Sequence, residues 1–307
     1  MNQVTDQQII EILRREAVPA LGCTEPVACA LACAKCKEVL GGVPEHLDVL
    51  VSGNIYKNGM GVGIPGTGMV GLPIAAALGA VCGKSEYGLE VLKDVNVGDN
   101  LQRAKDLLSH VTVSLKMDAP DKLYAEALAS KGNDKVKVII AHTHTNIILV
   151  EKNGEELFKR EFKLDTTKKE DKGPELSVKR IWDFVHEVDV KDIEFVLQGA
   201  EMNKAISAEG LQSEYGLQIG KTLKENIDKG LLEDDLLNRT LIRATAASDA
   251  RMDGCPKPVM TNSGSGNQGI TVYLPVVVAA EKFGASREQL TRALALSNLI
   301  AVHIHHY

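Results

Sequence analysis

The sequence of 307 residues is poor in aromatic side chains and in concentrated charge, and both shortages limit what it can bind. Aromatic residues make up 4% of the chain, too few for the stacking platforms that bind single-stranded nucleic acids. No Lys/Arg block is dense enough for a nucleic-acid surface. The most charged stretch, LDTTKKEDKGPE at 164–175, mixes both signs and predicts a solvated loop. We therefore expect no nucleic-acid partner.

Long apolar runs and dispersed cysteines are also missing. The apolar runs near 69–82 and 270–280 are too short, and too interrupted by glycine or proline, to cross a bilayer. Residues 1–18 have an amphipathic helical pattern without the features of a signal peptide. Most of the cysteines crowd into one stretch instead of forming a disulfide framework, which is typical of a reducing compartment. The sequence thus predicts a cytoplasmic protein with no membrane partner.

The pattern of the sequence changes twice along the chain. Ala-rich helical patterns flank a segment whose stretches HVTVSLKM and KVKVIIAHTHTNIILVEKNGEELFKREF predict strands, the latter joined by a KNGE turn. Between these two stretches, PDKLYAEALAS predicts a short helix. We therefore predict an α+β fold with a mostly helical core, residues 1–100 and 175–307. A small α+β subdomain with an antiparallel sheet is inserted at 101–174. The final stretch, SREQLTRALALSNLIAVHIHHY, is helical and apolar to its last residue, as expected of a fragment of a longer protein.

The stretch ALGCTEPVACALACAKCKEVL, residues 20–40, holds four of the six cysteines. Cys29, Cys33 and Cys36 fall on one face of a predicted helix. The first and last of them lie about 10 Å apart along its axis. That separation is too large for one small cluster, whose ligands usually come from wrapping loops. We interpret these three cysteines as buried packing residues.

Cys23 differs because it stands just before this helix. Thr24 as the cap, Glu25 in the first turn and Pro26 predict the helix start. Backbone N–H groups and the helix dipole at such a place favour a nucleophilic, basic or metal-binding thiol. The alternative is a small residue beside a turn at Gly22.

Residues 58–83, NGMGVGIPGTGMVGLPIAAALGAVCG, contain the G-x-G-x-x-G pattern twice. A dinucleotide fingerprint needs a buried apolar strand just before the loop, and the preceding SGNIYKNGM is polar and turn-like. We therefore expect no nicotinamide or flavin. Two interpretations remain, a loop that brings backbone amides to an anionic group and tight packing of helices.

Two further stretches are rich in polar groups. PVMTNSGSGNQGITVYLP predicts a loop that binds a charged group of a small substrate, or an ordinary polar turn. AHTHTNII places His142 and His144 on one side of a strand, as part of a pocket wall or as two metal ligands without a third. In SDARMDG, Arg251 and Asp249 are either an ion pair that orients the next loop or surface charge. The candidate substrate-binding residues are Thr24, His142, His144, Asn262, Ser263, Gly264, Ser265, Gly266 and Asn267.

With GCTEPVA, SGNIYKNGMGVGIPGTG, THTNI, ASDARMDG and MTNSGSGNQGI in this order, the chain resembles the family of cysteine desulfidase and the iron–sulfur-dependent serine dehydratase α-chain. The resemblance implies an α,β-eliminating lyase that needs no pyridoxal phosphate. It would convert L-cysteine to pyruvate, ammonia and sulfide, with L-serine as the alternative substrate. A [4Fe–4S] cluster held by three cysteines would act as a Lewis acid. Cys23 and Glu25 would be catalytic, Cys23 as cluster ligand or as base.

The sequence departs from this family in one respect. The other cluster cysteines of the family lie beyond the region that corresponds to SNLIAVHIHHY, so the remaining ligands are expected beyond Tyr307. We therefore expect the cluster to be absent from this chain. The alternative belongs to another functional class: a protein without a cluster that binds a small amino acid and does not convert it. The sequence is also compatible with a homodimer.

Overall fold

The computed structural model describes residues 4–160 and 176–305, whose contacts divide the chain into two compact units. Unit 1 comprises Met1–Ala20, Asp165–Arg251 and Lys257–Tyr307, and unit 2 comprises Leu21–Leu164 and Met252–Pro256. The loop predicted at 164–175 and the domain boundary predicted at 174 lie outside the described residues.

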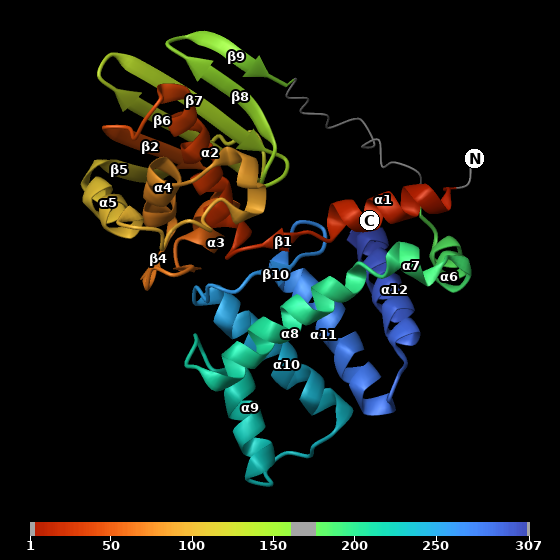
Figure 1. The fold of residues 1–307 in the computed structure, drawn as a ribbon. Helices are drawn as coiled ribbons and strands as arrows, with labels where there is room; N and C mark the ends of the chain where they lie inside the picture. Colours follow the sequence, from red (N-terminus) through yellow and green to blue (C-terminus); the bar gives the residue numbers. More distant parts are fainter. Residues whose placement is uncertain (1–3, 161–175, 306–307) are drawn as a thin grey trace. The chain divides into compact units, whose positions relative to one another are not determined.

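Unit 2 is built on a six-stranded sheet of order β5-β2-β6-β7-β8-β9 (Figure 1). All neighbouring strands are antiparallel except β2 and β5, which run parallel. The strands of unit 2 are β2 (His46–Val51), β3 (Gly63–Ile64), β4 (Met69–Val70), β5 (Val111–Leu115), β6 (Tyr124–Lys131), β7 (Asp134–Ala141), β8 (Ile147–Lys152) and β9 (Glu155–Lys159). Its helices are α2 (Thr24–Leu40), α3 (Gly53–Gly59), α4 (Leu72–Val81) and α5 (Asn100–Leu107), with 3-10 turns η1 (Ser85–Glu90) and η2 (Leu108–His110).

Helix α2 forms the centre of the unit 2 core. It packs against β6 and β7 and also against α4. Its middle is almost entirely Ala and Cys, and these residues are buried all round the helix. A helix that is apolar on every side needs cover on more than one face, which the sheet and α4 supply here. In β2 the side chains alternate between this core and the open face, so that Leu47 and Val49 are buried and Asp48 is exposed.

The predicted α+β class is confirmed, but the contacts divide the chain differently from the predicted division. Residues 21–100 belong with the sheet, whereas the sequence analysis placed them in the helical core. The reason is the burial of α2, whose contacts with β6 and β7 tie the N-terminal part to the later strands.

In its described residues, unit 1 is helical apart from one short antiparallel pair of strands, in which Pro19 faces Met260 and Ala20 faces Val259. Its first helix begins with a capping box between Thr5 and Gln8. None of the described helices is long and apolar enough to cross a membrane. The elements of unit 1 are α1 (Asp6–Glu16), β1 (Pro19–Ala20), α6 (Val178–Glu187), α7 (Val190–Ile193), α8 (Val196–Gln212), α9 (Ile219–Asp228), α10 (Leu236–Met252), β10 (Val259–Met260), α11 (Gly266–Phe283) and α12 (Arg287–His305).

Glu38 links the last turns of α2 to η1 and yields a test of this packing. Its carboxylate accepts the backbone N–H and the hydroxyl of Ser85, both at 2.6 Å, and pairs with Lys35 at 3.2 Å. Burial raises the pKa of Glu38, but these hydrogen bonds outweigh burial and hold the pKa below its ordinary value of 4.5. A carboxyl with a lowered folded-state pKa stabilises the fold above its unfolded pKa, and this contribution is lost as the pH falls through the folded pKa.

We therefore expect Glu38→Gln to lower the free energy of unfolding by about 1 kcal/mol at pH 7. The difference from the wild type should shrink once the pH falls below about 4.5. Urea unfolding of both proteins at pH 7 and pH 3.5 measures it. An equal difference at the two pH values would contradict the assignment.

Candidate active site

Cys23 lies at the entry to α2 in unit 2. It is the N-cap residue, with φ −79° and ψ 139°, and its side chain is only 6% exposed. The sequence analysis took Thr24 as the cap, which is wrong by one position, because Thr24 is already the first helical residue. Before the helix, Gly22 has φ +79°, and a Cβ there would lie 2.8 Å from the ring of Pro65. The turn into Cys23 therefore requires glycine.

The carboxylate of Glu25 collects three donors around the same helix start. The thiol of Cys23 donates to Oε2 with an Sγ–Oε2 distance of 2.8 Å, and the hydroxyl of Thr24 donates to the same oxygen at 3.3 Å. The side-chain amide of Asn58, from α3, donates to Oε1 at 3.2 Å. Glu25 and Cys23, the two predicted catalytic residues, are thus brought into direct contact.

Electrostatics keep Glu25 ionised. Burial raises its pKa, but hydrogen bonds from Cys23 and from its own backbone N–H act in the opposite direction. The charge of His144 and the Asn58 amide lower the pKa further, and the net result lies below the ordinary 4.5. At neutral pH this site therefore holds a carboxylate that accepts a hydrogen bond from a thiol, which is the arrangement needed to pass a proton between them.

The predicted placement of His142 and His144 on one side of a strand is wrong. Strand β7 ends at Ala141, and residues 142–146 form the turn that leads to β8. The side chain of Asn146 closes this turn by donating to the carbonyl of Ala141. The turn nevertheless brings His144 close enough to Glu25 for its charge to act on that carboxyl.

His142 occupies the first position of the turn with φ +70°. The Oδ2 atom of Asp121 accepts the backbone N–H of His142 at 3.0 Å and lies 2.7 Å from Nδ1 of the same histidine. Asp121 and Asn58 were missed by the sequence analysis. Asn58 lies within a motif that had been singled out, whereas nothing in the sequence pointed to Asp121.

The loop predicted to hold the substrate, residues 262–267, lies in unit 1. The amide of Asn262 donates to the carbonyl and to Oδ1 of Asn298, at 3.2 and 3.0 Å. Its Oδ1 accepts from the Ser263 hydroxyl and from the Gln268 amide. Asn262 is fully buried, so its side chain anchors the loop from within. The predicted substrate contact therefore has to come from other members of the loop.

The other loop residues form a tight turn that starts α11. Ser263 and Gly264 both have positive φ, and Ser265 caps the helix by accepting the backbone N–H of Gln268. Asn267 Oδ1 accepts from Nη1 of the buried Arg251 at 3.0 Å. A Cβ on Gly266 would lie 2.3 Å from Arg251 Nε, so glycine is required there. Arg251 thus reaches the following loop, whereas Asp249, its partner in the predicted ion pair, accepts the backbone N–H groups of Ile219 and Gly220.

The glycine-rich stretch after α3 forms the small β3–β4 hairpin and not a nucleotide loop. A Cβ on Gly63 would lie 2.3 Å from the carbonyl carbon of Asp253, and one on Gly71 would lie 2.9 Å from the carbonyl oxygen of Met60. These glycines let backbone segments approach one another closely. The close contacts support the packing interpretation over the anion-binding one.

Cys29, Cys33 and Cys36 are fully buried in the core of unit 2, as the packing interpretation predicted. Burial raises the pKa of the Cys29 thiol to about 12 and also raises the pKa values of Cys33 and Cys36. None of the six cysteines forms a disulfide. Within residues 4–160 and 176–305, no three His, Cys, Asp or Glu side chains are grouped to hold a metal ion. The described residues therefore do not fit a three-cysteine cluster.

The buried cysteines give a second test. Because Cys33 only fills space, Cys33→Ala is expected to cost about 1 kcal/mol of unfolding free energy and to leave any bound iron unchanged. Chemical denaturation and an iron assay on the reconstituted protein measure the two effects. Loss of iron from this variant would contradict the division of the cysteines into one reactive and three packing residues.

A thiol hydrogen-bonded to an ionised carboxylate beside a histidine-bearing turn is typical of enzymes that move protons. Consistent with this class, the family described as Serine dehydratase alpha chain matches residues 86–307. The chain belongs to this family, whose description is that of a lyase-type enzyme of amino-acid breakdown. The matched residues include the turn at 142–146 and the loop at 262–267.

Relatives matched over nearly the whole chain extend the likeness to the segment around Cys23. A UPF0597 protein of Actinobacillus pleuropneumoniae serotype 3 (strain JL03) is 49% identical over 301 residues, 98% of this chain and 69% of the relative. A UPF0597 protein of Aeromonas hydrophila is 48% identical over 97% of this chain and 68% of the relative. A UPF0597 protein of Parabacteroides distasonis is 47% identical over 99% of this chain and 71% of the relative. No solved structure matches the chain.

Proposed function

We propose that the chain is a lyase, independent of pyridoxal phosphate, that eliminates sulfide from L-cysteine and yields pyruvate and ammonia. L-Serine, which would give pyruvate and ammonia, is the alternative substrate. The observation that carries the proposal is the contact of Cys23 Sγ with Glu25 Oε2 at 2.8 Å. Membership of the serine dehydratase alpha chain family supports the reaction class.

In this proposal Cys23 is the base and Glu25 makes it one. The proton of the thiol passes to Oε2, and the resulting thiolate takes the proton from Cα of the substrate. As the Cα–H electron pair forms the Cα–Cβ double bond, the Cβ–S bond breaks and hydrogen sulfide leaves as its anion. The aminoacrylate that remains takes up a proton and is hydrolysed by water to pyruvate and ammonia. Asn58 and Thr24 hold the carboxylate in place for the first transfer.

The loop at 262–267 is proposed to bind the substrate's carboxylate. Because Asn262 donates to Asn298, the proposed donors are the backbone N–H groups that open α11 and the hydroxyl of Ser263. To reach the substrate, this hydroxyl would have to turn away from Asn262 Oδ1, to which it donates in this structure. The N-terminus of a long helix favours anions. A raised KM with little change in kcat in the variant Ser263→Ala would support this assignment.

The [4Fe–4S] cluster implied by the resemblance would supply a Lewis-acid iron for the departing group. Among the described residues only Cys23 is proposed as a ligand, since no three His, Cys, Asp or Glu side chains are grouped there. The cluster therefore stays a prediction, and no step above passes through it.

The experiment is anaerobic reconstitution of the full-length protein with iron and sulfide, followed by a pyruvate assay. L-Cysteine and L-serine are compared by their kcat/KM values, which decides between the two substrates. Pyruvate from L-cysteine together with sulfide release is the expected result. Absence of pyruvate from both amino acids, in a sample with the visible absorbance of a cluster, would contradict the proposal.

A protein that binds a small amino acid without converting it is the second candidate. It is favoured by one observation, that the described residues hold no group of three metal-binding side chains. Calorimetric titration of iron-free protein with L-cysteine and L-serine separates the two candidates. Saturable binding combined with no turnover after reconstitution would support the binding protein.

A further inference from the structure

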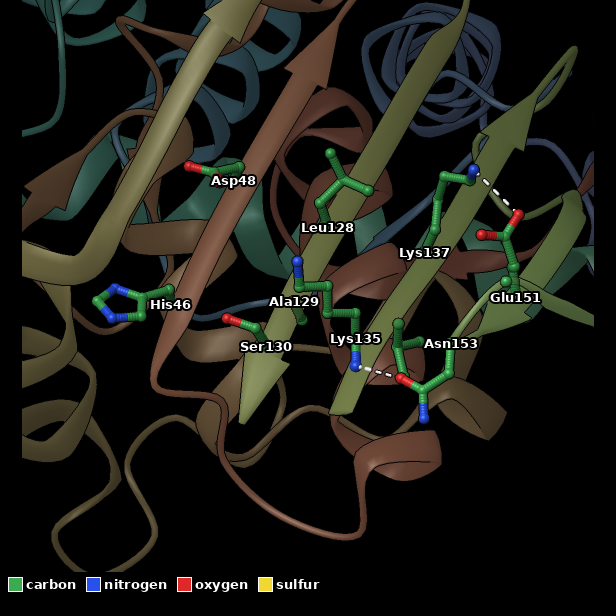
Figure 2. Close-up of a pocket in the computed structure, with 11 residues that line it drawn as sticks. His46, Asp48, Leu128, Ala129, Ser130, Lys135, Lys137, Glu151 and Asn153 are labelled. Atoms are coloured by element: carbon green, nitrogen blue, oxygen red, sulfur yellow. Dashed lines mark hydrogen bonds and ion pairs between the residues drawn. The ribbon is translucent and has the colours of Figure 1, made fainter. Parts of the chain in front are cut away.

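The open face of the unit 2 sheet carries a hollow that the proposed chemistry does not use (Figure 2). Its volume is about 600 Å³, within the range of pockets that hold small molecules. Strands β2, β6, β7 and β8 supply its floor and walls. The face of the sheet opposite to α2 therefore offers a space large enough for a small molecule.

The strand register places two rows of side chains across this hollow. In the first row, His46 of β2 is paired with Ser130 of β6, and Ser130 is paired with Lys135 of β7. Side chains directly opposite each other on neighbouring strands have Cβ atoms about 5 Å apart. An imidazole, a hydroxyl and an ammonium group thus stand side by side.

The second row holds one ammonium group and two carboxylates. Lys137 Nζ lies 3.0 Å from Glu151 Oε2, and Asp48 accepts a hydrogen bond from the neutral hydroxyl of Thr112. Between Lys137 and Asp48 stands Leu128, which is 36% exposed. The second row therefore offers an apolar contact and no cation for an anionic ligand, and the carboxylate of Asp48 keeps the anion on the side of the first row.

The first row, in contrast, carries a positive charge that the fold does not neutralise. Within the described part of the chain, Lys135 forms no ion pair, and its neighbour Asp134 is taken by Lys152 at 3.0 Å. In Figure 2 the side chain of Lys135 extends across β6, whereas Lys137 points to Glu151. Lys135 is thus placed to bind an anion from outside the protein.

We propose that this hollow binds a small organic oxyanion. The carboxylate or phosphate group is held by Lys135 and Ser130, with His46 as a third polar contact, and a short apolar part of the ligand rests on Leu128. A planar carboxylate and a phosphate offer the same acceptor oxygens to an ammonium and a hydroxyl group. The site is independent of Cys23 and Glu25, so it stands or falls apart from the proposed reaction.

The test is a titration of ¹⁵N-labelled protein with sodium propionate and, separately, with inorganic phosphate at constant ionic strength. Saturable shifts of the Ser130 and Lys135 amide signals are expected. Lys135→Gln should weaken the binding about tenfold or more, the effect of one hydrogen bond to a charged group. Lys159→Gln is the matched control, because this lysine lies on β9 outside the hollow. It should leave the binding unchanged.

The anion that gives the tighter saturation identifies the ligand's acidic group as carboxylate or phosphate. Absence of saturable shifts with both anions would overturn the proposal, and so would equal weakening in the two lysine variants. Should Lys135→Gln fail to fold, Ser130→Ala serves instead. This variant is expected to weaken binding several-fold, and unchanged binding in it would overturn the proposal as well.

Discussion

Replacing Cys23 with serine is expected to lower pyruvate formation from L-cysteine by about 10²- to 10⁴-fold, the usual contribution of a general acid–base group. A serine hydroxyl can still donate to Glu25, so the geometry of the helix start should persist. The hydroxyl is, however, a far weaker acid than a thiol and does not yield a usable base. The measurement is the pyruvate assay on reconstituted full-length protein, with wild type in parallel.

Cys33→Ala is the matched control for this prediction, because it removes a thiol from the same helix but from the core. It should keep its kcat while losing some stability. Thermal unfolding of the Cys23→Ser protein should match that of the wild type. A Cys23→Ser protein that unfolds early but turns over substrate normally would identify Cys23 as a packing residue.

Gly79→Ala is expected to give a large loss of stability from a single methyl group. Gly79 lies in α4, where an added Cβ would be 2.1 Å from the carbonyl oxygen of Ala30 in α2. On helix propensity alone the change would stabilise the protein by about 1 kcal/mol. The clash forces the two helices apart, and we expect a net loss of about 2–3 kcal/mol. Urea unfolding measures the difference.

Gly61→Ala is the control for Gly79, since a Cβ at Gly61 meets nothing within 4 Å. It should change the unfolding free energy by less than about 0.5 kcal/mol. If both variants were equally stable, the close approach of α2 and α4 would not be a feature of the folded protein. If both were equally destabilised, the loss in Gly79→Ala could not be assigned to the contact of α4 with α2.

The fold class followed from local patterns, whereas the grouping of elements did not. Alternating residues predicted the strands β5, β7 and β8. The stretch PDKLYAEALAS at 120–130 was wrongly predicted as a short helix, because its Ala and Leu residues favour a helix, whereas residues 124–131 form strand β6 between β2 and β7. The run of Ala and Cys in α2 predicted a buried helix but carried no sign of which elements would cover it. Its partners β6 and β7 lie about a hundred residues further along, and only the folded chain reveals that contact.

The same limit applies to the site. Cys23 was predicted because it stands just before a helix start, where the chemistry is local, whereas the catalytic role of Glu25 was predicted from the family resemblance. The anchoring role of Asn262 depends on Asn298, and the ionisation of Glu25 depends on Asn58 and His144. Such contacts across long stretches of sequence have no signature in the spacing of residues. The turn at His142 was missed because alternation suggested that β7 continues.

The way unit 1 is assembled from separate stretches sets the order in which the chain can mature on the ribosome. Residues 21–160 form one continuous segment of unit 2 and are available early. Strand β1 cannot pair before β10 has been synthesised, since Pro19 pairs with Met260, 241 positions later. The apolar face of α1, which includes Ile9 and Leu13, packs against Leu299 of α12. It can therefore be buried only after α12 has been synthesised. During synthesis this N-terminal face stays exposed, and the nascent chain should therefore depend on a holding chaperone until α12 emerges.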